Sequence, residues 1–94
     1  MRKPTPLPAI ELVEAKYFYD PITGDICFHK TGKPVRNNDR TTGVPKVRVG
    51  RVTTQAARLA WLLFYREDPV NYRICHIDNN PFNNRIDNLR KVKL

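Results

Sequence analysis

The chain has 94 residues, of which 40% are hydrophobic, 28% charged and 10% aromatic. This composition is that of a single folded domain with a modest core, and the length excludes a second domain. No stretch approaches the roughly 20 apolar residues of a membrane-spanning helix, and the two cysteines, Cys27 and Cys75, lie outside any CxxC spacing. We therefore expect a soluble cytoplasmic protein with reduced thiols and no membrane contact.

The formal net charge of +8 is unevenly distributed along the chain. Residues 1–29 carry three basic and four acidic groups, residues 30–60 carry eight and one, and residues 61–94 carry six and four, which gives −1, +7 and +2. A local excess of positive charge favours contacts with phosphates, although a small protein can also be basic for solubility alone. The charge predicts DNA or another nucleic acid as a partner.

The first third of the chain predicts an arm and then a β-hairpin. Three prolines among the first eight residues favour a polyproline-like arm, which we assign to residues 1–16. In residues 17–28, aromatic and apolar residues flank the turn sequence DPITGD, which is typical of a hairpin. Its alternating residues form the expected buried face: Tyr17, Tyr19, Ile26 and Phe28.

A second extended pair is predicted after a polar loop, with a tight turn at Gly50–Arg51. On its first strand Lys46 and Arg48 alternate with Val47 and Val49, so one face is expected to be apolar and the other cationic. We interpret the cationic face as the surface that contacts nucleic acid or a partner. The residues assigned to this contact are Lys46, Arg48, Arg51 and Arg58.

Residues 54–66 have the spacing of an amphipathic helix, with Thr54 as a candidate N-cap. The residues of its apolar stripe are Ala57, Leu59, Trp61, Leu62, Leu63 and Phe64. Asp68–Pro69 lies beyond the helix because the residue before a proline avoids the helical region. This segment is the predicted core helix.

The last quarter of the chain predicts a two-stranded ribbon. Residues 71–77 alternate and are rich in β-branched side chains, and residues 89–94 alternate again. Between them lies a tight turn in which Asn79 can adopt the left-handed region, followed by one short helical turn. The predicted fold class is therefore α+β, with β-hairpins, one core helix and a terminal ββ ribbon.

The sequence CHIDNNPFNNRIDNLRKV, residues 75–92, resembles the motif of phage-type HNH endonucleases, and the resemblance extends over residues 17–94. It implies a ββα-metal fold that hydrolyses DNA phosphodiesters with the help of a divalent cation. On this resemblance His76 occupies the general-base position, and Asn88 is the central asparagine that braces the loop after the first strand. It also implies an origin in a phage or mobile element.

The sequence departs from this family at the metal ligands. Cys75 stands where the family has a metal-binding Asp, and a thiol is a soft ligand that suits Mg²⁺ poorly. The third motif residue lies on a later helix in the family, and this sequence ends six residues after Asn88. We therefore expect no metal site, a vestigial His76 and a domain without the usual terminal helix. Asp78 and Asp87 remain open as substitute ligands.

The interpretation is a degenerate, truncated HNH-like protein that binds nucleic acid or a nucleic-acid-processing protein, and that needs no cofactor. One alternative is an active, Mg²⁺- or Mn²⁺-dependent DNA nickase. Another is a phage inhibitor that docks the same basic face on a host polymerase, a CRISPR effector or another ribonucleoprotein. The terminal ribbon is expected to need a cover, for which the core helix, the arm or a second copy in a homodimer are candidates, and a dimer or a partner-bound surface is favoured.

Overall fold

The computed structural model of the chain describes residues 7–35, 43–50 and 52–93. Its elements are, in order, α1 (Ile10–Glu14), β1 (Tyr17–Asp20), β2 (Asp25–Phe28), β3 (Lys46–Val49), β4 (Val52–Gln55), α2 (Ala56–Tyr65), β5 (Tyr72–His76), the 3-10 turn η1 (Ile86–Asn88) and β6 (Leu89–Lys93). The strands form three separate antiparallel pairs, β1–β2, β3–β4 and β5–β6. This confirms the predicted α+β class with β-hairpins, one main helix and a terminal ribbon.

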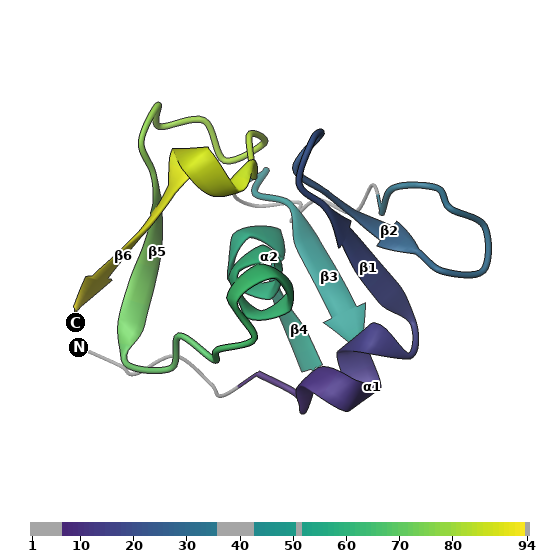
Figure 1. Cartoon of the computed structure of the whole chain (residues 1–94). Helices are drawn as coiled ribbons and strands as arrows, with labels where there is room; N and C mark the ends of the chain where they lie inside the picture. The colour runs from purple at the N-terminus through teal and green to yellow at the C-terminus, as the bar shows by residue number, and fades with distance from the viewer. Residues whose placement is uncertain (1–6, 36–42, 51, 94) are drawn as a thin grey trace.

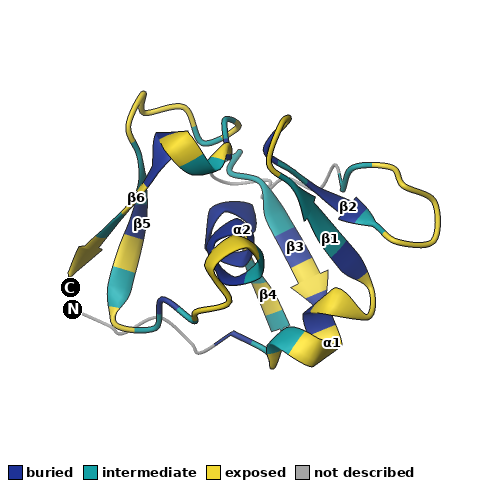
Figure 2. Cartoon of the chain, viewed as in Figure 1, coloured by how far each residue is buried: buried dark blue, intermediate teal, exposed yellow. Residues whose placement is uncertain are grey.

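Helix α2 lies between the β5–β6 ribbon on one side and the other two hairpins on the opposite side (Figure 1). Its first seven residues, Ala56 to Leu62, are all buried, and the colouring in Figure 2 shows that α2 is largely buried while the surrounding strands alternate between buried and more exposed residues. A helix that is buried all round must be apolar all round. The segment AARLAWLL meets this requirement except at Arg58.

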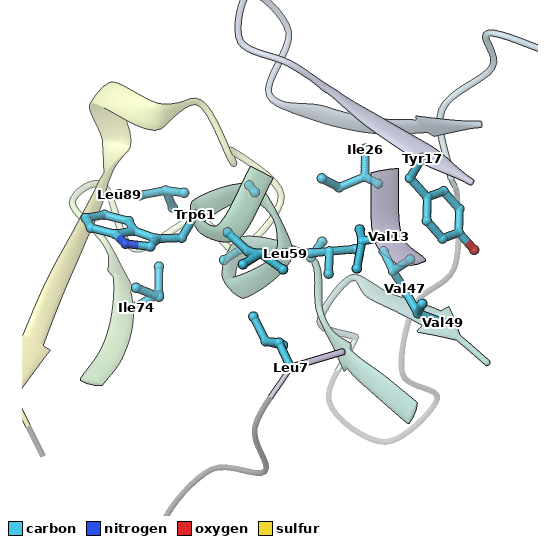
Figure 3. Close-up of a cluster of buried hydrophobic side chains, with 14 residues drawn as sticks. Leu7, Val13, Tyr17, Ile26, Val47, Val49, Leu59, Trp61, Ile74 and Leu89 are labelled. Atoms are coloured by element: carbon cyan, nitrogen blue, oxygen red, sulfur yellow. The ribbon is translucent and has the colours of Figure 1, made fainter. Parts of the chain in front are cut away.

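The core has two parts that meet on α2 (Figure 3). Trp61 points towards Ile74 and Leu89 of the ribbon, each 6% exposed, whereas Leu59 points towards α1 and β3. Lys91 of β6 also forms a salt bridge with the segment after α2, because its Nζ lies 2.8 Å from Glu67 Oε1. The inner face of the ribbon is thus covered by α2 within one chain, while a homodimer stays a prediction.

Several local predictions are confirmed by the pairing registers. Tyr17 lies opposite Phe28 and Tyr19 opposite Ile26, so these four residues share one face of the first hairpin. Asn79 has a φ of 62°, as the turn prediction required. The predicted helix start is wrong, because Thr54 pairs with Val47 in β4 and α2 begins at Ala56.

Phe64 also differs from its prediction as a core residue. It is 45% exposed and lies at the end of α2. Its ring packs edge-on against Tyr19, with centroids 6.2 Å apart. The apolar stripe of α2 therefore reaches solvent in its last turn.

The segment predicted as an arm contributes to the core in the part that the structure describes. Ile10–Glu14 forms α1, Val13 is fully buried, and Leu7 is 8% exposed with its backbone N–H donating to Asp68 Oδ2 at 3.0 Å. The structure thus differs from the arm prediction at Ile10–Glu14, where the chain is helical, and residues 1–6 lie outside the described part. Among the described residues no helix is long and apolar enough to cross a membrane.

The turn of the first hairpin packs directly against the chain before η1. Gly24 has a φ of +80°, and a Cβ added there would lie 2.5 Å from the backbone nitrogen of Arg85. Gly32 has a φ of +72°, but an added Cβ would meet nothing within 4 Å. Substitutions at the two glycines therefore distinguish two costs. Backbone strain is present at both positions, whereas close packing is present only at Gly24.

We expect Gly32→Ala to lower the free energy of unfolding by about 1–2 kcal/mol, the cost of a left-handed backbone for an L-residue. Gly24→Ala should lower it by about 1–3 kcal/mol more, because the methyl group displaces the chain at Arg85. Equilibrium urea denaturation of both variants measures the difference. Equal losses would contradict the close contact between the hairpin and the 84–85 segment.

Candidate functional site

The loop between β5 and η1 is closed by the side chain of Asn88, which is 9% exposed. Its Oδ1 accepts a hydrogen bond from the backbone N–H of Asp78 at 3.2 Å. Its Nδ2 donates to Asp78 Oδ1 and to the backbone carbonyl of Asn83, both at 2.9 Å. One amide therefore joins the two ends of the loop, at the position where the resemblance placed a bracing asparagine.

Short polar side chains replace regular backbone pairing within this loop. Asp78 Oδ1 accepts from the backbone N–H of Asn80 at 2.8 Å, and Asn80 Oδ1 accepts from that of Phe82 at 3.0 Å. Such two-residue side-chain to backbone bonds form tight turns without a partner strand. This accounts for the concentration of asparagine in the segment.

Asp78 receives donors from several sides of the loop. The Asn83 amide donates to its Oδ2 at 3.0 Å. Together with the Asn80 backbone, the Asn88 amide and nearby His76, this contact lowers the pKa of Asp78 to about 2. The carboxylate stays ionised at neutral pH, and its oxygens are occupied by N–H groups of the loop itself.

His76 lies at the end of β5 and is held by a residue that the sequence pattern did not single out. Its Nε2 is 2.7 Å from Oδ1 of Asn84, which is 5% exposed. When Nε2 carries the proton and donates it to Asn84, Nδ1 is the basic nitrogen. The sequence shows two adjacent asparagines, Asn83 and Asn84. Which of them contacts His76 depends on the path of the loop, and this path places Asn84 there.

Asn84 is itself fixed by the first hairpin. The Tyr19 hydroxyl donates to the backbone carbonyl of Asn84 at 2.6 Å. Burial raises the pKa of Tyr19 to about 12, so the phenol keeps the proton that it donates. The hairpin turn at Gly24 packs on the same stretch of chain. His76 is thus supported, through Asn84, by an element far away in the sequence.

The cationic face predicted on β3 is present in the structure. Val47 and Val49 are buried at 2% and 7% exposure, whereas Arg48 is exposed and Lys46 is partly exposed. In the antiparallel pair Lys46 lies opposite Gln55 and Arg48 opposite Thr53, so the outer face of the hairpin is polar and positively charged. Arg51, which was assigned to the same surface, lies outside the described residues.

Arg58 does not belong to this surface, which corrects its assignment to nucleic-acid or partner binding. It is 7% exposed, and its Nη1 and Nη2 donate to the backbone carbonyls of Tyr72 and Pro69, each at 2.8 Å. Burial lowers its pKa, and the charge of Asp68 opposes that shift. The guanidinium therefore joins α2 to the start of β5 and is unavailable to a phosphate.

The fold and loop define a small α+β domain in which two strands enclose a loop with a histidine at one end and a bracing asparagine at the other. Residues 55–93 match the family model described as HNH endonuclease, so this segment is similar to that family. No curated protein and no solved structure matches the chain. The HNH-like segment indicates a function related to nucleic acids, and it contains both His76 and Asn88.

The divalent cation implied by this family does not fit the described residues. Among them, no three His, Cys, Asp or Glu side chains are grouped so that they could hold a metal ion. Cys75 lies opposite Arg90 in the ribbon register, and the oxygens of Asp78 are bonded within the loop. A hard cation takes several oxygen ligands, and each Asp78 oxygen already accepts at least one hydrogen bond from the loop.

The contacts of Asn88 predict a large effect on stability. Asn88→Ala should lower the free energy of unfolding by about 2–4 kcal/mol, because it removes three hydrogen bonds and leaves buried partners unpaired. Asn71→Ala is the matched control, since Asn71 is exposed and outside the loop. Urea denaturation of both variants measures the effect. Similar small losses would show that the loop does not depend on Asn88.

Proposed function

We propose that this chain is a nucleic-acid-binding protein of HNH-like fold, of phage or mobile-element origin as the resemblance implies. In this proposal the outer face of β3–β4 contacts phosphates, and the loop around His76 is retained as a structural element without metal-dependent cleavage. The observation that carries the proposal is that Lys46 and Arg48 lie on the same outer face of β3, while the valines that alternate with them are buried. Point charges on a strand suit phosphates and read no base edges.

Two further observations support it. The segment that matches the HNH endonuclease family makes nucleic acid the expected class of partner. The described residues lack a set of side chains that suits the family's cation. The charged strand face and the family match therefore both support binding.

The second candidate function is a working DNA nickase. It is favoured by one observation, the 2.7 Å contact between His76 Nε2 and Asn84 Oδ1, which orients an imidazole as a general base requires. In that case an ion would need ligands beyond those that the described residues offer. The two candidates differ in whether purified protein cleaves DNA.

A protein or ribonucleoprotein partner, such as a host polymerase or CRISPR effector, would use the same cationic face. Capture of partners from a lysate with and without nuclease treatment separates these cases. A partner that is retained after nuclease treatment indicates a protein surface. Loss of all captured material after the treatment supports direct contact with nucleic acid.

Binding to duplex DNA should weaken as the salt concentration rises. The slope of log K against log salt should show whether the outer face of β3 contacts phosphates. Each phosphate contact adds about 0.9 to the magnitude of that slope. The double variant Lys46→Gln/Arg48→Gln should therefore flatten the slope by about 2. Lys30→Gln/Lys33→Gln removes the same charge from two exposed residues that follow β2.

Fluorescence anisotropy titrations between low and moderate salt measure both slopes. We expect the control pair to keep the slope of the unmodified protein. An unchanged slope in the β3 variant, or an equal change in the control, would show that the strand face is not the phosphate contact.

Purified protein should not nick supercoiled plasmid in Mg²⁺ or Mn²⁺, because the described residues lack a ligand set for either ion. Cys75→Asp alone should remain inactive. Agarose gel assays measure the conversion to open circles. Metal-dependent nicking that is lost in His76→Ala, but kept in the control His29→Ala, would overturn the binding proposal in favour of the nickase.

A further inference from the structure

A cleft of about 240 Å³ opens beside the loop that holds His76. Five segments line it: the turn and second strand of the first hairpin at Gly24, the chain at Val35, β3 at Lys46, the first turn of α2 at Ala56, and the loop at Phe82 and Asn84. No local sequence pattern predicted this cleft. It adjoins the outer face of β3–β4 to which the phosphate contacts were assigned, because Lys46 belongs to both.

Phe82 presents an aromatic ring at this cleft. The residue is 59% exposed, although its backbone N–H is fixed by Asn80 Oδ1 at 3.0 Å. The backbone is therefore fixed at Phe82, while the ring stays exposed. An exposed ring can stack another flat ring.

Asn84 lines the same cleft. Its Oδ1 contacts His76 and its backbone carbonyl accepts from Tyr19, so the residue is 95% buried and held at two points. Its amide nitrogen Nδ2 donates no hydrogen bond within the part of the chain that the structure describes. A held amide with an unused donor can fix the orientation of a ligand that carries an acceptor.

The size and lining of the cleft restrict the ligand. Pockets for whole small molecules usually begin at about 300 Å³, so this cleft suits a single ring system. Its apolar wall includes Ile26, Val35 and Val47. Lys46 adds a positive charge at the β3 side, and Asp25 adds a negative charge at the start of β2. A flat apolar ring with polar acceptors on its edge matches the apolar wall, and a phosphate attached to it would have to lie on the Lys46 side.

We propose that the cleft binds one unpaired nucleobase, stacked on Phe82 with an acceptor facing the Asn84 amide, while the adjoining phosphates lie along β3. This inference rests on the proposed function, that the chain binds nucleic acid. It adds the substrate class: the protein prefers a strand that offers an unpaired base over an intact duplex.

Three end-labelled duplexes test the preference by anisotropy at one salt concentration. The first is fully paired, the second carries one additional unpaired adenine, and the third carries an abasic nucleotide at that position. The abasic duplex has the same local break but no base to stack. We expect the unpaired adenine to bind about 5- to 30-fold more tightly than the abasic duplex.

Two variants locate the effect in the cleft. Phe82→Ala removes the ring, and Val35→Phe fills the space, so each should abolish the difference between adenine and abasic duplexes. Tyr65→Ala is the matched control, because Tyr65 is also an exposed aromatic residue but lies at the opposite end of α2. It should retain the full difference.

The outcomes separate the two proposals. Absence of binding to all three duplexes would overturn the proposed function. Equal binding of the adenine and abasic duplexes by the unmodified protein, with salt-dependent affinity intact, would overturn only the cleft assignment. Loss of the difference in Tyr65→Ala as well as in Phe82→Ala would also overturn it, because the preference would then not depend on the cleft.

Discussion

The fold depends on one constraint, that a two-stranded ribbon is not stable alone. This chain has three such ribbons and, among the described residues, no sheet that joins them, so each must pack against the same helix. Small residues at Ala56, Ala57 and Ala60 allow the strands to approach α2 closely, and Leu59 and Trp61 fill the space on its two sides. Arg58 is tolerated there because two backbone carbonyls satisfy its guanidinium. The same bonds set the position of β5 and hence of the loop that follows it.

The loop around His76 is held from two directions. Asn88 closes it from within, and the first hairpin holds it from outside through Tyr19 and the glycine turn at Gly24. Both outer contacts fall on Asn84 or its neighbour, which is also the partner of His76. The hairpin lies outside the segment that matches the HNH endonuclease family. It therefore acts as a support for that segment, and the histidine position depends on residues more than fifty positions earlier in the chain.

Alternation predicted the hairpins and the ribbon because strand faces repeat every two residues, and the left-handed Asn79 followed from its turn sequence. Arg58 was misassigned because a count of charges does not show which side chains are buried. The carbonyls that accept its hydrogen bonds lie 11 and 14 residues away, and they reach it only after the chain reverses. Asn84 and the cleft could not be predicted for a related reason. Each is defined by segments that only tertiary packing brings together.

The ribbon register also bears on why the cation of the family does not fit. Partners across an antiparallel pair share one face, so Ile74 and His76 lie on the same side as Leu89, whereas Cys75 shares the other side with Arg90. A carboxylate at position 75 would therefore face a guanidinium, and a charge-assisted bond to that group competes directly with metal coordination. The opposing cation would also repel a divalent ion at that place. The register thus places a cation across the strand pair in addition to the sulfur at position 75, and Cys75→Asp would change only the second of these.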